Sequence, residues 1–217
     1  MQVHAIIPAA GASRRLEGHI KVLSRNALTG KSLLQHCLDA ICDLHGLESV
    51  TLVLGPPHGP CIEATLPAAH LKKLHILRHT CNNKGLGDSI ALAVSSLPEC
   101  LPDSAFLILL PDQPELSPKA IATLCEHHDF SNFNAITTAQ YTGETWGPPL
   151  LAGSAYRKAF EALNGAQGAK AILLRNVHYM QSVVLPDFTG VDLDTLPLLQ
   201  SHGWEPFPVP TSGCTPH

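Results

Sequence analysis

The chain has 217 residues, of which 45% are hydrophobic and 15% charged, and its formal net charge is −4. This length and composition fit one globular domain with a buried core and exclude a disordered or fibrous protein. The negative charge argues against broad nucleic-acid binding, because a surface that follows phosphates needs an excess of Lys and Arg. We therefore expect any phosphate recognition to be local.

From the sequence we expect neither a secretion signal nor a membrane span. Its first residues lead directly into an apolar run, and the longest apolar run, residues 105–111, is far below the ~20 residues that cross a bilayer. Seven cysteines without CxxC spacing are typical of free thiols in the cytoplasm. Cys125, His127 and His128 stand together, but their spacing fits no metal site, so we expect solvated residues at a helix end.

Strand-like and helix-like segments alternate along the chain. The short apolar runs that fit buried strands are residues 4–7, 50–54, 74–77, 105–110, 135–138 and 182–185. Apolar residues with helical spacing predict one helix over 33–44, with Ser32 as its N-cap, and another over 86–97. This alternation predicts an α/β fold in which helices cover both faces of a mostly parallel sheet.

Two later segments interrupt the alternation. Residues 141–153, YTGETWGPPLLAG, are rich in Gly, Pro and aromatic residues, and we expect a functional loop or flap there. The Pro-rich segment 205–217 is expected to be poorly ordered at its end. We therefore expect one domain over 1–204, followed by a tail.

Three glycine-containing stretches are candidate phosphate loops. Gly30 begins the GKS of a Walker A loop, but the first glycine of that motif is replaced by Arg25. Gly85 and Gly87 begin a dinucleotide fingerprint whose third glycine is missing. The best candidate is the opening loop at residues 9–13, whose small residues let backbone N–H groups approach phosphate oxygens.

Cations follow the opening loop closely. Arg15 and Lys21 supply charge for a polyphosphate, although they are also compatible with a tight turn that carries solvated basic residues. Ligands of open α/β sheets bind at the carboxyl ends of the strands. The opening loop and the LLPDQP at residues 109–114 should therefore lie on one rim and share one site, in which Asp112 is either a metal ligand or a turn residue.

The ordered set of motifs resembles the MobA/MocA-like nucleotidyltransferases, which attach CMP or GMP to the molybdenum cofactor. The motifs are PAAGASRRLEGHIK from residue 8, GLGDSIALAV from 85, LLPDQP from 109, GPPLL from 147, GAQGAKAILL from 165 and DLDT from 192. The resemblance covers most of the chain. It implies a three-layer, Rossmann-like fold of the nucleotide-diphospho-sugar transferase type with a mostly parallel mixed sheet.

The resemblance also implies a site for a nucleoside triphosphate, Mg²⁺ and a phosphorylated acceptor. The residues that it assigns to nucleotide binding are Ala9, Ala10, Gly11, Ala12, Ser13, Gly87 and Ser89. Those that it assigns to charge stabilisation and metal binding are Arg15, Lys21, Asp112, Asp192 and Asp194. It places the acceptor against the loop residues Trp146, Gly147 and Pro148. Asp194 is equally compatible with a helix cap before Leu196.

The implied reaction is attack of an acceptor phosphate oxygen on the α-phosphorus of the nucleotide, with release of pyrophosphate. The AAG spelling of the opening motif is closer to the cytidine-using branch, so CTP is the expected donor and molybdopterin the expected acceptor, with a molybdoenzyme or its chaperone as a possible partner. An alternative that stays open is a nucleotidyltransferase that uses GTP as the donor and another small phosphorylated molecule as the acceptor.

Some residues depart from the family pattern. Glu17 replaces a common Gly, Ala166 a common Asp and Lys170 a common Arg, and the acidic residue usual after Pro197 is missing. These departures leave open a catalytically weak protein that binds nucleotide or molybdenum cofactor and delivers it to a partner. A nicotinamide-dependent oxidoreductase is disfavoured because no GxGxxG is present.

Overall fold

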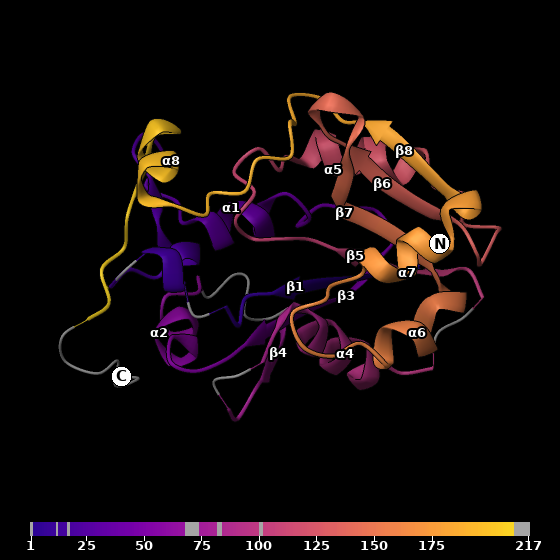
Figure 1. Cartoon of the computed structure of the whole chain (residues 1–217), viewed down its shortest axis with the longest axis horizontal. Helices are drawn as coiled ribbons and strands as arrows, with labels where there is room; N and C mark the ends of the chain where they lie inside the picture. Colours follow the sequence, from indigo (N-terminus) through magenta and orange to yellow (C-terminus); the bar gives the residue numbers. More distant parts are fainter. Residues whose placement is uncertain are drawn as a thin grey trace.

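The computed structural model describes residues 2–11, 13–16, 18–67, 74–81, 84–99 and 102–210. A seven-stranded sheet in the order β4-β3-β1-β5-β7-β6-β8 forms its centre (Figure 1). Its strands are β1 (Gln2–Pro8), β3 (Leu47–Leu54), β4 (Leu74–Arg78), β5 (Ser104–Ile108), β6 (Ile136–Gln140), β7 (Trp146–Gly153) and β8 (Met180–Val184). All neighbours are parallel except β7, which runs antiparallel to β5 and β6. The prediction of a mostly parallel mixed sheet is confirmed.

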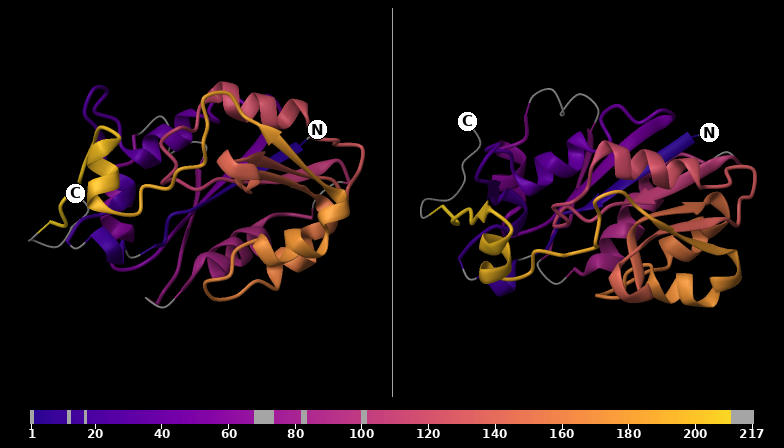
Figure 2. Two further views of the ribbon diagram at one scale, coloured as in Figure 1. Left: turned by 45° about the horizontal axis from the view of Figure 1, so that its top comes forward. Right: turned by 90° about the horizontal axis from the view of Figure 1, so that it is seen from above.

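Helices cover both faces of this sheet. They are α1 (Leu33–Asp39), α2 (Gly59–Ala64), α4 (Leu86–Ser96), α5 (Pro118–Glu126), α6 (Arg157–Glu161), α7 (Lys170–Arg175) and α8 (Leu196–Ser201). Helices α1, α2 and α5 pack on one face, and α4, α6 and α7 on the other, as the left view of Figure 2 shows for α5 and α4. Ile7 and Ile6 of β1 point to these opposite faces, and both are fully buried. The central strand is therefore buried on both sides, as its continuous apolar run predicts.

Local sequence signals set the starts of two helices. Ser32 caps α1 by accepting a hydrogen bond from the Gln35 N–H at 3.1 Å, as predicted. Ser117 does the same for α5 through the Ala120 N–H at 3.2 Å. Helix α1 ends at Asp39, before the expected residue 44, and residues beyond it continue as turns.

The expected flap at residues 141–153 is a strand from Trp146 onward. Strand β7 lies between β5 and β6, where a loop would have broken the sheet. Its two prolines lack the N–H groups that a ladder requires, and the pairing with β6 changes register next to them, between Thr138 and Ala139. The prolines and glycines of this strand led to the prediction of a loop. Its second half, which contains Leu150, Leu151 and Ala152, is apolar and buried.

A second, two-stranded sheet connects a segment near the C-terminus to a segment that follows the opening loop. It pairs β2 (Arg25–Asn26) with β9 (Trp204–Glu205). Its apolar support is a separate cluster of Leu16, Leu33, Leu193, Leu199 and Trp204. Beyond β9, the Ile20 N–H donates to the Phe207 carbonyl and the Val209 N–H to the Gly18 carbonyl, each at 2.8 Å. Both views of Figure 2 place α8 beside the indigo segment that follows β1, and the expected end of the tail, residues 211–217, lies outside the described residues.

The remaining sequence expectations concern thiols, metal and membranes. Of the cysteines that the structure describes, Cys37, Cys42, Cys81 and Cys125 are free thiols. None of the helices in the described ranges is long and apolar enough to span a bilayer. His128 is buried and bonds to the Thr137 hydroxyl through Nδ1 at 2.9 Å, so the expectation of a solvated residue is wrong for it.

The buried His128 predicts a loss of stability in mild acid. Burial lowers its pKa to about 4, from an ordinary value of 6.5 in the unfolded chain. Between these values the unfolded chain binds the proton and the folded chain does not, so stability falls as pH falls through this window. The loss should reach roughly 3 kcal/mol, at ~1.4 kcal/mol for each pKa unit.

Chemical denaturation at pH 7 and pH 4.5 measures this loss, with His128→Gln as the comparison. The variant should lose less of its free energy of unfolding than the unmodified chain over the same interval, whatever its stability at pH 7. Equal losses in the two proteins would show that other groups cause the acid sensitivity.

Candidate active site

The opening loop begins where β1 leaves the sheet. The Ala9 N–H still donates to the Val53 carbonyl of β3 at 2.8 Å. Ser13 then adopts a left-handed backbone conformation with a φ of 49°, which non-glycine residues rarely adopt and which is found preferentially at functional sites. Its Oγ accepts a hydrogen bond from the Lys21 backbone N–H at 3.0 Å. This contact fixes the position from which the Lys21 side chain starts.

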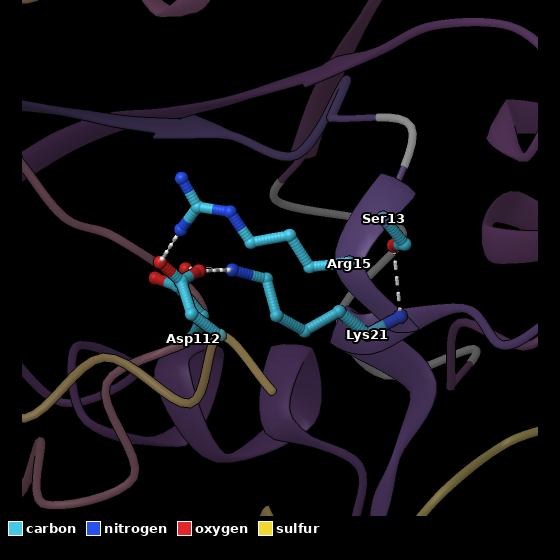
Figure 3. A network of polar contacts seen from close by, with 5 residues as sticks. Ser13, Arg15, Lys21 and Asp112 are labelled. Carbon is cyan, nitrogen blue, oxygen red and sulfur yellow. Dashed lines mark hydrogen bonds and ion pairs between the residues drawn. The ribbon is translucent and has the colours of Figure 1, made fainter. Parts of the chain in front are cut away.

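The Lys21 ammonium joins two carboxylates from distant parts of the chain. Its Nζ donates to Oδ2 of Asp112 and, at 2.7 Å, to Oδ1 of Asp194. Arg15 donates to the other oxygen of Asp194 at 2.6 Å. Figure 3 shows the Arg15 and Lys21 side chains extending alongside each other toward these carboxylates. The side chains of Lys21 and Asp112 are each only 17% exposed, so this pairing is shielded from solvent far more than a surface ion pair.

A backbone hydrogen bond brings the DLDT segment to Asp112. The Leu193 N–H donates to the Asp112 carbonyl at 3.1 Å, and the Leu193 side chain is fully buried. Asp192 and Asp194 therefore flank an anchored residue. The interpretation of Asp194 as a helix cap is wrong, because the N-cap position of α8 is Thr195 and the Asp194 carboxylate is bound by Lys21 and Arg15.

The charges in this network shift each other's pKa values. Burial alone would lower the pKa of Lys21, but Asp112 and Asp194 outweigh it and raise that pKa. Burial alone would raise the pKa of Asp194, but Lys21 and Arg15 outweigh it and lower that pKa. Burial and the nearby Asp112 raise the pKa of Asp192 to about 6. The positive charge near Asp192 is thus too weak to offset the effect of burial and of Asp112 on its pKa.

These residues could hold a divalent metal ion. Asp192 Oδ1 is buried and has no hydrogen-bond partner within the described structure, and it lies close enough to Asp112 for the two carboxylates to repel. Carboxylate oxygens are the donors that Mg²⁺ prefers, and this ion usually takes one or two of them together with substrate phosphates. No three His, Cys, Asp or Glu side chains of the described residues form a metal-binding group by themselves. The donor set therefore fits a metal that arrives with a phosphate ligand.

A cavity of about 360 Å³ opens over the network. Its walls come from the opening loop, the segment after β5, the DLDT segment and the start of α4. The lining residues are Pro8, Ala9, Ala10, Gly11, Ser13, Arg15, Leu16, Lys21, Val22, Lys84, Gly85, Leu86, Ser89, Leu110, Pro111, Asp112 and Asp194. The prediction that the opening loop and the PDQP segment share one rim is therefore confirmed.

The start of α4 is fixed by a close approach of two loops. Oδ2 of Asp88 accepts from the Gly85 N–H at 2.8 Å and from the Gly165 N–H at 3.0 Å. A Cβ on Gly87 would lie 2.3 Å from the Gln167 carbonyl oxygen, so only glycine fits there. The GAQG segment thus supports α4 from behind the cavity.

The structure brings together most of the residues that the sequence assigns to the nucleotide. Ala9, Ala10, Gly11, Ser13, Arg15, Lys21, Ser89, Asp112 and Asp194 all line the cavity. Gly87 and Asp192 do not, and Ala12 lies outside the described residues. Sequence reasoning missed Lys84, which lines the cavity and forms an ion pair with Asp88 at 3.5 Å. Its place directly before the GLGDS motif is the only signal that could have indicated it.

The predicted acceptor residues lie in β7, outside the cavity lining. Gly147 is packed so closely against Tyr141 that a Cβ would lie 2.5 Å from its hydroxyl, and that hydroxyl donates to the Pro148 carbonyl. The Gln113 amide in turn donates to the Tyr141 hydroxyl at 3.0 Å. A chain of hydrogen bonds therefore connects β7 to the residue after Asp112.

Comparisons with known proteins agree on the fold. Residues 5–180 match the family of MobA-like NTP transferase domains. Among solved structures, Rv0371c of Mycobacterium tuberculosis H37Rv is similar over 94% of this chain and 97% of its own, with 17% identity and a TM-score of 0.75. A second structure of Rv0371c, with 15% identity and a TM-score of 0.69 over 94% of this chain and 98% of its own, is a complex with manganese.

A cytidylyltransferase also has a similar fold. The 2-C-methyl-D-erythritol 4-phosphate cytidylyltransferase of Francisella tularensis matches 93% of this chain and 100% of its own, with 15% identity and a TM-score of 0.60. No curated protein sequence matches the chain closely enough to count as a relative. At such identities the structural likeness shows the fold alone.

Two glycine-to-alanine substitutions should differ in their effect on stability, because Gly87 is packed against backbone behind the cavity whereas Gly11 has open space beside it. In Gly87→Ala the new Cβ meets backbone, which should lower the free energy of unfolding by roughly 1–3 kcal/mol despite the better helix propensity of alanine. In Gly11→Ala the Cβ meets nothing within 4 Å, so stability should stay within ~0.5 kcal/mol. Thermal and chemical denaturation of both variants checks this, and a Gly87→Ala protein as stable as Gly11→Ala would contradict the packing.

Proposed function

Because this chain belongs to the MobA-like NTP transferase family, we propose that it transfers a nucleoside monophosphate from CTP to a phosphorylated small molecule, with molybdopterin as the favoured acceptor. The observation that carries the proposal is one cavity lined by a small-residue loop, by Arg15 and Lys21 with the two carboxylates that they bind, and by a third cation, Lys84. This combination suits a polyphosphate and its metal ion rather than a neutral ligand. The free thiols of Cys37, Cys42, Cys81 and Cys125 fit a reducing cytoplasm.

The residues of this chain supply positioning and charge. Backbone N–H groups of Ala10 and Gly11 and the Ser13 hydroxyl bind the phosphates, beside Ala9, whose own N–H stays in the sheet, while Arg15 offsets charge on the departing pyrophosphate. Lys21 stabilises the charge that grows on the α-phosphate oxygens as the acceptor phosphate attacks in line. The acceptor supplies the nucleophile, so no side chain has to form a covalent intermediate.

Mg²⁺ would be held by Asp112 together with Asp192 or Asp194. When bound, it supplies a Lewis acid that neutralises the triphosphate and orients its α-phosphate. The unpartnered Asp192 oxygen next to Asp112 supports this assignment. The acceptor is assigned to Trp146, Gly147 and Pro148, whose link to Asp112 through Tyr141 and Gln113 would couple its position to the metal carboxylate.

Substrate binding requires the ion pairs to change partners. Lys21 and Arg15 are bound to carboxylates, so a triphosphate alone must compete with Asp112 and Asp194 for the same cations. If Asp112 and Asp194 held a divalent ion, Lys21 and Arg15 would be left available for the phosphates. Metal and nucleotide should therefore bind with positive cooperativity.

Pyrophosphate release from CTP, GTP, ATP and UTP with Mg²⁺ and molybdopterin tests the proposed reaction. CTP should be the best donor, and Asp112→Asn should lower the rate about 100-fold or more, because the transition-state charge loses its main support. The matched control is Asp39→Asn. Asp39 is the last residue of α1, lies away from the cavity and pairs with Lys31 through its carboxylate. Tighter binding of GTP than CTP would contradict the donor assignment. CTP binding without turnover of any nucleotide would favour a delivery protein.

The change of partners can be tested by titrating CTP with and without Mg²⁺. Asp194→Asn removes the carboxylate that holds Arg15 and part of the hold on Lys21, so metal-free CTP should bind about three- to tenfold more tightly than to the unmodified chain. The gain in affinity from Mg²⁺ should shrink in the same variant. Asp39→Asn should change neither quantity, and weaker metal-free binding to Asp194→Asn would show that Asp194 does not compete with phosphate.

A further inference from the structure

The cavity has a wall that the charge network does not use. The first turn of α4 contributes Leu86 and Ser89, which lie in the same cavity as Arg15 and Lys21. If the cations bind the triphosphate, this wall is left for the nucleoside. Ser89 is 2% exposed, and its hydroxyl is therefore a polar group that can be recognised only by protein or by a ligand in the cavity.

The hydrogen of the Ser89 hydroxyl already has protein partners. Oγ lies 3.2 Å from the Gly85 carbonyl oxygen, one turn back in the chain, and 3.1 Å from Nε2 of His79. A hydroxyl has one hydrogen to donate and two lone pairs that accept. Whether the hydrogen goes to Gly85 or to His79, it stays inside the protein. Ser89 lines the cavity, so Oγ then has a lone pair left with which it can accept from a ligand there.

His79 is itself held in place to make this contact. It directly follows β4, and its backbone N–H donates to the Leu54 carbonyl of β3 at 2.9 Å. Burial, together with the charge of Lys84, lowers the pKa of His79, so the imidazole is neutral at pH 7. A neutral imidazole has one nitrogen that donates and one that accepts, and either form can pair with a hydroxyl. Without His79, the Ser89 hydroxyl would keep only the long contact to Gly85.

We propose that His79 is a positioning residue that holds the Ser89 hydroxyl as a hydrogen-bond acceptor toward the cavity and thereby selects cytosine over uracil. The proposal rests on the proposed function, since it takes the cavity to bind a nucleoside triphosphate. Cytosine presents an amino group at the position where uracil presents a carbonyl oxygen. The amino group can donate to Ser89 Oγ.

Uracil would place an acceptor against an acceptor. To bind its carbonyl, the Ser89 hydroxyl must turn its hydrogen into the cavity and give up its bond to Gly85 or His79. Sites built around a buried hydrogen bond reject the analogue that cannot make it, because the polar groups are then left unpaired. The preference should therefore depend on His79, although His79 does not line the cavity.

Equilibrium binding of CTP and UTP in the presence of Mg²⁺, measured by calorimetry, tests the proposal without requiring turnover. His79→Leu should lower the ratio of CTP to UTP affinity about tenfold, the effect of one buried hydrogen bond. His79→Gln, whose amide can donate or accept at the same place, should restore most of the ratio. The matched control is His75→Leu, the same change at an exposed site on β4 away from the cavity, and it should leave the ratio unchanged.

A double-mutant cycle with Ser89→Ala decides whether His79 acts through Ser89. Once the hydroxyl is absent, His79→Leu should have no further effect on the ratio, whereas a general loosening of α4 would lower both affinities again. CTP binding with a ratio that His79→Leu leaves unchanged overturns the inference and leaves the proposed function intact. A failure of the unmodified chain to bind any nucleoside triphosphate overturns the proposed function, and the inference with it.

Discussion

The contact of the Lys21 ammonium with the carboxylates of Asp112 and Asp194 is the interaction around which the rest of the site is arranged. It joins the opening loop, the segment after β5 and a segment near the C-terminus. A partly buried cation between two carboxylates is favoured only when all three groups are held in place. Without that geometry, their attraction does not offset the cost of removing the charges from water. The sheet, the left-handed Ser13 and the buried Leu193 meet this requirement by fixing each group through its backbone.

The order of the strands explains why these groups meet. Strands β1 and β5 are parallel neighbours, so their carboxyl ends bring the opening loop and Asp112 to the same rim. The antiparallel β7 lies between β5 and β6, so β5, β6 and β8 run in the same direction and the chain returns to this rim after β6, at Tyr141, and again after β8. The second small sheet and its apolar cluster tie that returning segment to the N-terminal region.

The sequence was sufficient for the features that depend on local pattern. The apolar runs of β1 and β5, the Ser32 cap and the shared rim all follow from periodicity and strand direction. Strand β7 could not be recognised, because its prolines and glycines are tolerated only where the register shifts, which is a property of the partner strand. The contact between His79 and Ser89 could not be predicted either, since ten residues separate them and the sequence between them has no periodic pattern.

Features that the sequence predicts and features that it does not predict also differ in the role that we propose for them in the site. The groups proposed to bind phosphate and metal lie in short motifs, because small-residue loops and charged side chains at strand ends are suited to that chemistry. The group proposed to recognise the nucleobase is the Ser89 hydroxyl, which contacts Gly85 and a neighbour, His79, that lies outside every motif. The proposed chemistry can therefore be predicted from the sequence, whereas the proposed choice of substrate depends on how the chain packs around α4.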